Sequence, residues 1–231
     1  RSLWDGVHFV ANLAPCILLG VAFANLFMGI PVDAQGVYHG NLLALLNVYG
    51  LAGGVFFLCM FVLHGSLWLA IKSRGDLQTR AVATASFMWP IMLVLLVAFL
   101  ILSAFYTKLF DNYLAMPILL VLPLLALAGL VGARIMLRAG KLWCAWAFSG
   151  LFILGVTFFG VVGMFPGMII SSIDPAATVT AFNGASSQLT LKIMLGVALV
   201  MVPIVLLYQF WMYRLFSEPV LPKDLDDDHA Y

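Results

Sequence analysis

The feature that most constrains this chain is a series of long apolar runs without charges. One of them, FMWPIMLVLLVAFLILSAF from Phe87 to Phe105, contains no Asp, Glu, Lys or Arg and is apolar on every side. A run of about 18 or more such residues is typical of a transmembrane helix. A transmembrane β-strand is about ten residues long and alternates apolar with polar side chains. The run therefore predicts an α-helical membrane protein and excludes a barrel.

Six such runs follow one another along the chain. Charged residues make up 9% of the sequence and the mean hydropathy is +1.10, whereas soluble domains carry about 25% charge. Each run is long enough to cross a hydrocarbon core of about 30 Å as a helix. We therefore expect an all-α integral membrane protein, a single polytopic domain over residues 1–231 whose six or so transmembrane helices pack as a bundle. The expected helices span about 8–29, 43–71, 82–106, 115–137, 143–165 and 189–214.

The basic residues predict the orientation of these helices. Only Lys108 and Lys192 fall on one side of the predicted membrane, and the other nine of the 11 fall on the opposite side. Loops rich in Lys and Arg face the cytoplasm, so both ends of the chain are expected there. The nine are Arg1, Lys72, Arg74, Arg80, Arg134, Arg138, Lys141, Arg214 and Lys223.

His64 is the strongest candidate for chemistry within the expected helices, because an ionisable residue inside a span is a functional hypothesis by default. It could bind a haem, with Met60 or His8 as a second ligand, or relay protons. It could equally be a neutral histidine bonded to a neighbouring helix. No paired carboxylates, HExxH motif or phosphate-binding loop is present, and the three cysteines lack metal-like spacing. We predict no catalytic residue and no metal site, and the net charge of +1 gives no reason to expect nucleic acid.

A polar stretch, SSIDPAATVTAFNGASSQLTLKI from Ser171 to Ile193, separates the last two apolar runs. It could carry chemistry at a membrane face, or it could start the last helix. Ser186 or Ser187 can accept from the backbone N–H groups that open a helix, and Gln188 can bond locally. No nucleophile–base pair accompanies them. We therefore interpret the stretch as a connection that ends in a helix cap.

Several motifs, in order along essentially the whole chain, resemble subunit II of the cytochrome bd-type quinol oxidases. The Ser-Ser-Gln-Leu-Thr run is the most specific of them. The motifs are LWDGVHFVANLAPCILLGVAFANLFMGIPVD, LLALLNVYGLAGGV, LHGSLWLAIKSRGDLQTRA, GMFPGMIISS, ASSQLTLKIM and VPIVLLYQFWMYRLF.

The resemblance implies a non-haem-ligating subunit of a terminal oxidase in the bacterial inner membrane. The oxidase couples quinol oxidation to reduction of dioxygen to water. Haems b and d and the quinol site are expected in subunit I, and some members add a small single-helix subunit. Subunit II is built of two four-helix bundles, supports assembly, shapes oxygen or proton access, and in some members holds a structural quinone or lipid.

The family's opening helices, with their Gly-Phe-Asp and Trp-Asp-Gly-Asn-Gln motifs, have no counterpart here. The chain starts at Arg1 without a methionine. We therefore expect that it is the C-terminal portion of a subunit II, with residues missing upstream. The tail KDLDDDHAY is expected to be a solvated cytoplasmic end. A component of a small secondary transporter or channel is the alternative, which the absence of a copurifying haem protein would favour.

Overall fold

The computed structural model describes residues 2–219 and 221, so Arg1, Lys223 and the acidic tail lie outside the described residues. Six helices in this part are long and apolar enough to cross a membrane. They are α1 (Ser2–Met28), α2 (Val48–Lys72), α3 (Asp76–Tyr106), α5 (Val121–Arg138), α6 (Leu142–Met164) and α7 (Gln188–Leu215). The short elements are α4 (Asp111–Ala115), 3-10 turns at Leu42–Leu45, Pro117–Leu120 and Pro175–Ala177, and strands β1 (Gly167–Ile169) and β2 (Val179–Thr180).

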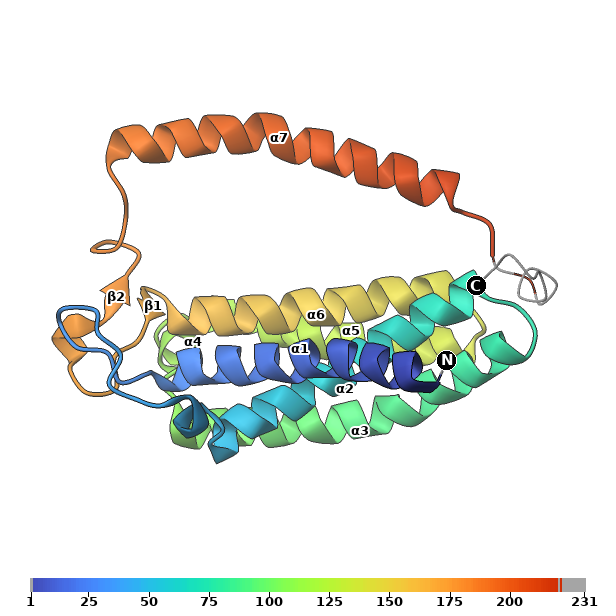
Figure 1. The fold of residues 1–231 in the computed structure, drawn as a ribbon, viewed down its shortest axis with the longest axis horizontal. Helices are drawn as coiled ribbons and strands as arrows, with labels where there is room; N and C mark the ends of the chain where they lie inside the picture. Colours follow the sequence, from blue (N-terminus) through green and yellow to red (C-terminus); the bar gives the residue numbers. More distant parts are fainter. Residues whose placement is uncertain (1, 220, 222–231) are drawn as a thin grey trace.

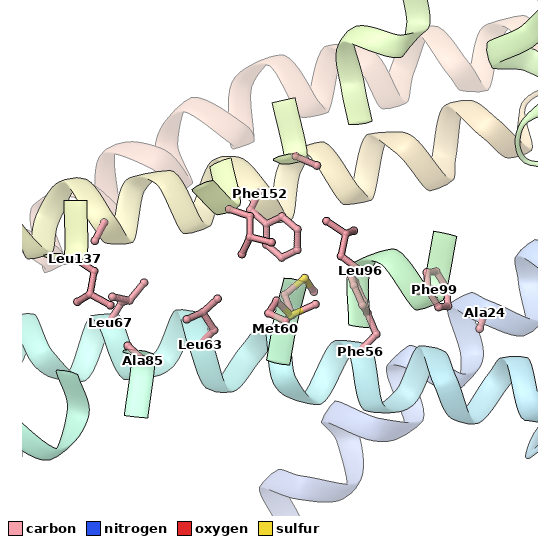
Figure 2. Packing of buried hydrophobic residues seen from close by; sticks show 14 of the residues in the cluster. Ala24, Phe56, Met60, Leu63, Leu67, Ala85, Leu96, Phe99, Leu137 and Phe152 are labelled. Atoms are coloured by element: carbon pink, nitrogen blue, oxygen red, sulfur yellow. The ribbon is translucent and has the colours of Figure 1, made fainter. Parts of the chain in front are cut away.

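Five of the long helices form a bundle with α2 at its centre (Figure 1). Helix α2 packs against α1, α3 and α6, while α5 packs mainly against α6. The core is formed by large side chains along α2 (Figure 2). Phe56 and Met60 lie near Phe152 of α6 and Leu96 of α3, and Leu67 lies near Leu137 of α5. The sequence-based expectation of an all-α membrane protein is confirmed.

Glycines let the backbones of neighbouring helices approach closely, as Gly53-Gly54 and Gly155 predict. A Cβ added to Gly53 would lie 2.6 Å from the Ala24 Cβ of α1. A Cβ added to Gly155 would lie 2.6 Å from the Ala126 backbone nitrogen of α5. The α1–α2 and α5–α6 seams therefore have no room for larger residues at these points.

Several helices begin elsewhere than hydropathy predicts. Helix α1 starts at Ser2 rather than near 8, and α3 starts at Asp76 rather than near 82. Hydropathy marks only the part of a helix that suits lipid, whereas backbone hydrogen bonding continues through polar residues. Residues 42–45 form a separate 3-10 turn, after which the Asn47 side chain caps α2 by accepting from the Gly50 N–H. Helix α5 likewise begins at Val121, after the Pro117–Leu120 turn.

Helix α7 lies apart from the bundle along most of its length (Figure 1). None of its most hydrophobic window is buried. Near its C-terminal end, the Tyr213 ring lies 5.5 Å from that of Trp68 and the Lys72 ammonium donates to the Phe216 carbonyl. At its N-terminal end it follows β2, in the connection that links α6 to α7. The expected bundle thus contains five helices in the described part of the chain, and α7 is tethered to it at its two ends.

Candidate functional site in the membrane interior

His64 lies about two turns before the end of α2 and its ring reaches α6. Its Nδ1 is 2.8 Å from the Ser149 Oγ, and the Ser149 hydroxyl donates to the Trp146 carbonyl at 2.7 Å. Because a hydroxyl has a single proton, Ser149 must accept from His64, and Nδ1 carries the ring proton. The geometry therefore assigns the donor role in this bond to the His64 ring and the acceptor role to Ser149.

Aromatic side chains surround this hydrogen bond. The Trp146 ring centroid is 5.3 Å from that of His64, and the Trp68 centroid is 5.2 Å from Trp146. The Trp146 Nε1–H is buried and has no hydrogen-bond partner among the described residues. His8 is exposed on α1, and no described hydrogen bond or ring contact joins it to His64. Across the described residues no three His, Cys, Asp or Glu side chains gather as metal ligands.

A cavity of about 560 Å³ lies among α1, α2, α3, α5 and α6, on the side of His64 toward Met60. Its lining is aromatic and aliphatic apart from Thr157, whose hydroxyl donates to the Ile153 carbonyl at 2.8 Å. Cavities of about 300–1,000 Å³ hold small ligands, and apolar cavities stay dry and accept apolar molecules. This space can hold a hydrocarbon chain or an apolar gas, and none of its described lining residues could perform acid–base chemistry.

The cavity does not fit a haem. Haem iron is bound by an axial His, Cys, Met or Tyr, and among the described lining residues only Met60 is of such a type. None of those residues carries a charge that could pair with the haem propionates. His64 itself is half-buried against Trp146 and does not line the cavity.

The polar stretch before α7 contains the helix cap. Ser187 is the N-cap residue, and its Oγ accepts from the Thr190 N–H at 3.2 Å. Ser186 precedes the cap, and Gln188 is the first helical residue. Earlier in the stretch, Ser171 donates from its hydroxyl to the Val32 carbonyl, which joins this connection to the one between α1 and α2.

At this end of the bundle, the α1–α2 connection contains an aspartate with a shifted pKa, and the α3–α5 connection contains a tyrosine with a shifted pKa. The Asp33 carboxylate accepts from the His39 ring and from the Val37 and Gln35 N–H groups, and these bonds lower the pKa of Asp33. In α4, burial raises the pKa of Tyr113 to about 12, and its hydroxyl donates to the Phe159 carbonyl. The Asp33 bonds hold the α1–α2 connection together and the Tyr113 bond joins α4 to α6, and neither residue is among the described lining of the cavity.

Asn25 is a structural residue that the sequence analysis missed. It is buried in α1, where its side-chain amide donates to the Val21 and Leu45 carbonyls at 2.8 Å and its Oδ1 accepts from Asn47 at 2.7 Å. A buried polar group is costly unless it is hydrogen-bonded. An asparagine within the apolar run FANLF therefore predicts a polar partner on a neighbouring segment.

Comparisons with known proteins match most of the chain. The family model for cytochrome bd terminal oxidase subunit II matches residues 1–216. The chain is 32% identical to a cytochrome bd ubiquinol oxidase subunit 2 of Bacillus subtilis, over 96% of this chain and 65% of that protein. It is 33% identical to a probable cytochrome oxidase subunit 2 of Haemophilus influenzae, over 92% of this chain and 64% of that protein. It is 29% identical to the cytochrome bd-I ubiquinol oxidase subunit 2 of Escherichia coli, over 98% of this chain and 68% of that protein. The chain thus spans about two thirds of the length of these relatives.

Proposed function

The chain belongs to the family of cytochrome bd terminal oxidase subunit II, and from this premise we propose that it serves in a quinol oxidase without binding the haems. The oxidase couples quinol oxidation to reduction of dioxygen to water. Haems b and d lie in a partner subunit I, with a small single-helix subunit as a further partner. The match over residues 1–216 carries this proposal, and two relatives are named as ubiquinol oxidase subunits. Membership in this family favours an oxidase over a transporter component.

The membrane interior supports a role without haem ligation. His64 donates to Ser149 and packs against Trp146, and the large cavity has no strong axial ligand in its described lining. An apolar cavity suits dioxygen or a lipid-like chain better than a charged cofactor. We place the contribution of this chain in assembly and in oxygen access, with the reaction itself in the partner.

The exposed helix α7 supports assembly with a membrane partner. Its apolar side chains, such as Leu199 (67% exposed) and Leu207 (69% exposed), are uncovered along its length. Helices in a bilayer associate by close packing rather than by hydrophobic driving force. A haem-bearing subunit that packs against α7 would fix a helix that its own bundle leaves free.

Purification of the tagged chain from its native membrane tests the proposal. We expect a haem-bearing subunit to copurify in equal amount, with a visible spectrum of b- and d-type haem and quinol-dependent oxygen consumption. Haem should stay with the partner when the two subunits are separated. A purified complex without haem, or haem that remains on this chain after separation, would contradict the proposal.

A further inference from the structure

The turn between α2 and α3 and the turn between α5 and α6 lie side by side at one end of the bundle. They line an open surface cavity of about 320 Å³, separate from the apolar cavity inside the bundle. Arg74 and Gln78 line it from the first turn, and Lys141 and Trp143 line it from the second. Two cations that are distant in sequence therefore face one small space.

Two glycine turns bring Arg74 and Lys141 to this cavity, and a hydrogen bond orients the Arg74 side chain. Gly75 and Gly140 adopt left-handed φ values of +70° and +72°, which end one helix and admit the next. The Arg74 Nη1 donates to the Ser73 carbonyl at 3.0 Å, so one corner of the guanidinium is fixed at the end of α2. Its other nitrogens remain available, because an arginine has five N–H donors.

The cavity has positive charge and no matching negative charge among its described lining residues. The ion pairs of the described chain are Asp33–His39 and Asp76–Arg80, and neither involves Arg74 or Lys141. Most other charges at this end are also basic. Among the described residues they are Lys72, Arg80, Arg134, Arg138 and Arg214, against Asp5, Asp76 and Glu218. An anion is the ligand that this arrangement would attract.

Apolar groups complete the lining. Ile71 and Leu142 line the cavity beside the cations, and the Trp143 side chain is 57% exposed at the start of α6. Tryptophan is enriched where a membrane meets water, and these turns lie at the ends of helices that can cross one. A ligand that fits both parts has a charged head and a hydrocarbon tail.

We infer that this cavity binds the phosphate group of an anionic phospholipid, between Arg74 and Lys141, with the lipid tails beside Trp143. Basic pockets between transmembrane helices bind anionic lipid head groups. The guanidinium fork suits phosphate oxygens and the lysine adds a point charge. The inference is independent of the oxidase role and concerns the chain in any membrane complex.

A lipid-binding measurement on the purified complex tests this inference. The complex is reconstituted in phosphatidylcholine nanodiscs with increasing phosphatidylglycerol, and bound lipid is counted by native mass spectrometry. Each cation near the site contributes roughly a fivefold change in affinity. We therefore expect Arg74→Gln with Lys141→Gln to weaken phosphatidylglycerol binding about 25-fold.

The matched control removes two charges from the same end but outside the cavity, by Arg80→Gln with Arg138→Gln. It should leave the specific binding within about twofold. Equal weakening by both pairs would show a diffuse surface effect and overturn the inference. If millimolar inorganic phosphate displaces the lipid, the cavity binds free phosphate rather than a phospholipid head group, and the inference is overturned.

Cys144 provides a second readout in the unaltered protein, because it lines the same cavity and is exposed. Bound phosphatidylglycerol should slow its modification by a thiol reagent, relative to pure phosphatidylcholine. This readout decides the question even if the double variant fails to assemble. An unchanged modification rate at saturating phosphatidylglycerol would overturn the inference.

Discussion

At the scale of single residues, His64 shows how a polar group is accommodated inside an apolar bundle. Its one described side-chain hydrogen bond reaches Ser149 on another helix, and the Ser149 hydroxyl in turn donates a hydrogen bond to the Trp146 carbonyl. The result is a short chain of donors that begins at the Nδ1–H group of His64. This bond lowers the cost of burying the imidazole, because a buried polar group is costly unless it is hydrogen-bonded.

Substitution of His64 tests whether it binds haem. His64→Gln retains an N–H that can donate to Ser149, whereas His64→Leu removes it. We expect both variants to keep the full haem spectrum of the complex, and His64→Leu to lose about 1 kcal/mol of unfolding stability. Visible spectra and denaturant titrations measure the two effects. Loss of a haem band from a complex with normal subunit content would assign His64 as a ligand.

Sequence reasoning could identify His64 as unusual but could not name its partner. Ser149 is 85 residues away in the chain, and only the packing of α2 on α6 brings the two together. The cap before α7 was easier to locate, because a serine and the N–H it receives are three residues apart. Local chemistry can be read from sequence spacing, whereas contacts between helices depend on how the helices rotate and cross.

At the scale of elements, the start of α7 depends on one of two adjacent serines. Ser187→Ala should cost about 1 kcal/mol of helix-end stability, because it removes the acceptor for the Thr190 N–H. Ser186→Ala is the matched control and should have little effect. We expect less assembled complex for Ser187→Ala but near-normal turnover per haem. Normal haem content with turnover reduced by a factor of roughly 10² would indicate proton transfer instead.

Two glycines of α2 provide a matched test of the α1–α2 seam. A Cβ at Gly53 would lie 2.6 Å from the Ala24 Cβ, whereas a Cβ at Gly65 would meet nothing within 4 Å. Gly53→Ala should therefore destabilise the protein by about 1–3 kcal/mol through overpacking. Gly65→Ala should be neutral or stabilising by up to about 1 kcal/mol. The free energy of unfolding of both variants is measured in mixed detergent. Equal values would contradict the expectation, because they would mean that α1 and α2 can move apart at no cost.

At the scale of the whole molecule, the basic turns and the β1–β2 connection lie at opposite ends of the bundle (Figure 1). The positive-inside rule predicts that the basic end faces the cytoplasm. We expect Arg74→Cys and Arg138→Cys, in a background without native cysteines, to resist an impermeant thiol reagent in intact cells. Asp33→Cys and Asp174→Cys should react. Labelling of position 74 by reagent added outside the cell would show that the predicted orientation is wrong.

The number of long helices follows from the sequence, but the position of α7 does not. Its residues are as apolar as those of α6, so hydropathy places both in lipid. Hydropathy does not distinguish a helix covered by its own bundle from one whose apolar side chains stay exposed. The same limit applies to the ends of α1 and α3, which extend beyond their most apolar parts.

The glycine contacts also have a consequence for how such sequences can diverge. A Cβ on Gly20 would collide with the backbone of Gly53, and one on Gly53 would lie 2.7 Å from the Gly20 carbonyl oxygen. A backbone atom cannot be made smaller by mutation, so relief at these two positions requires the two helices to move apart. At Gly160 the obstacle is the ring of Phe27, a side chain that can shrink. Gly20 and Gly53 should therefore stay fixed during evolution, while positions 27 and 160 are free to vary as a correlated pair.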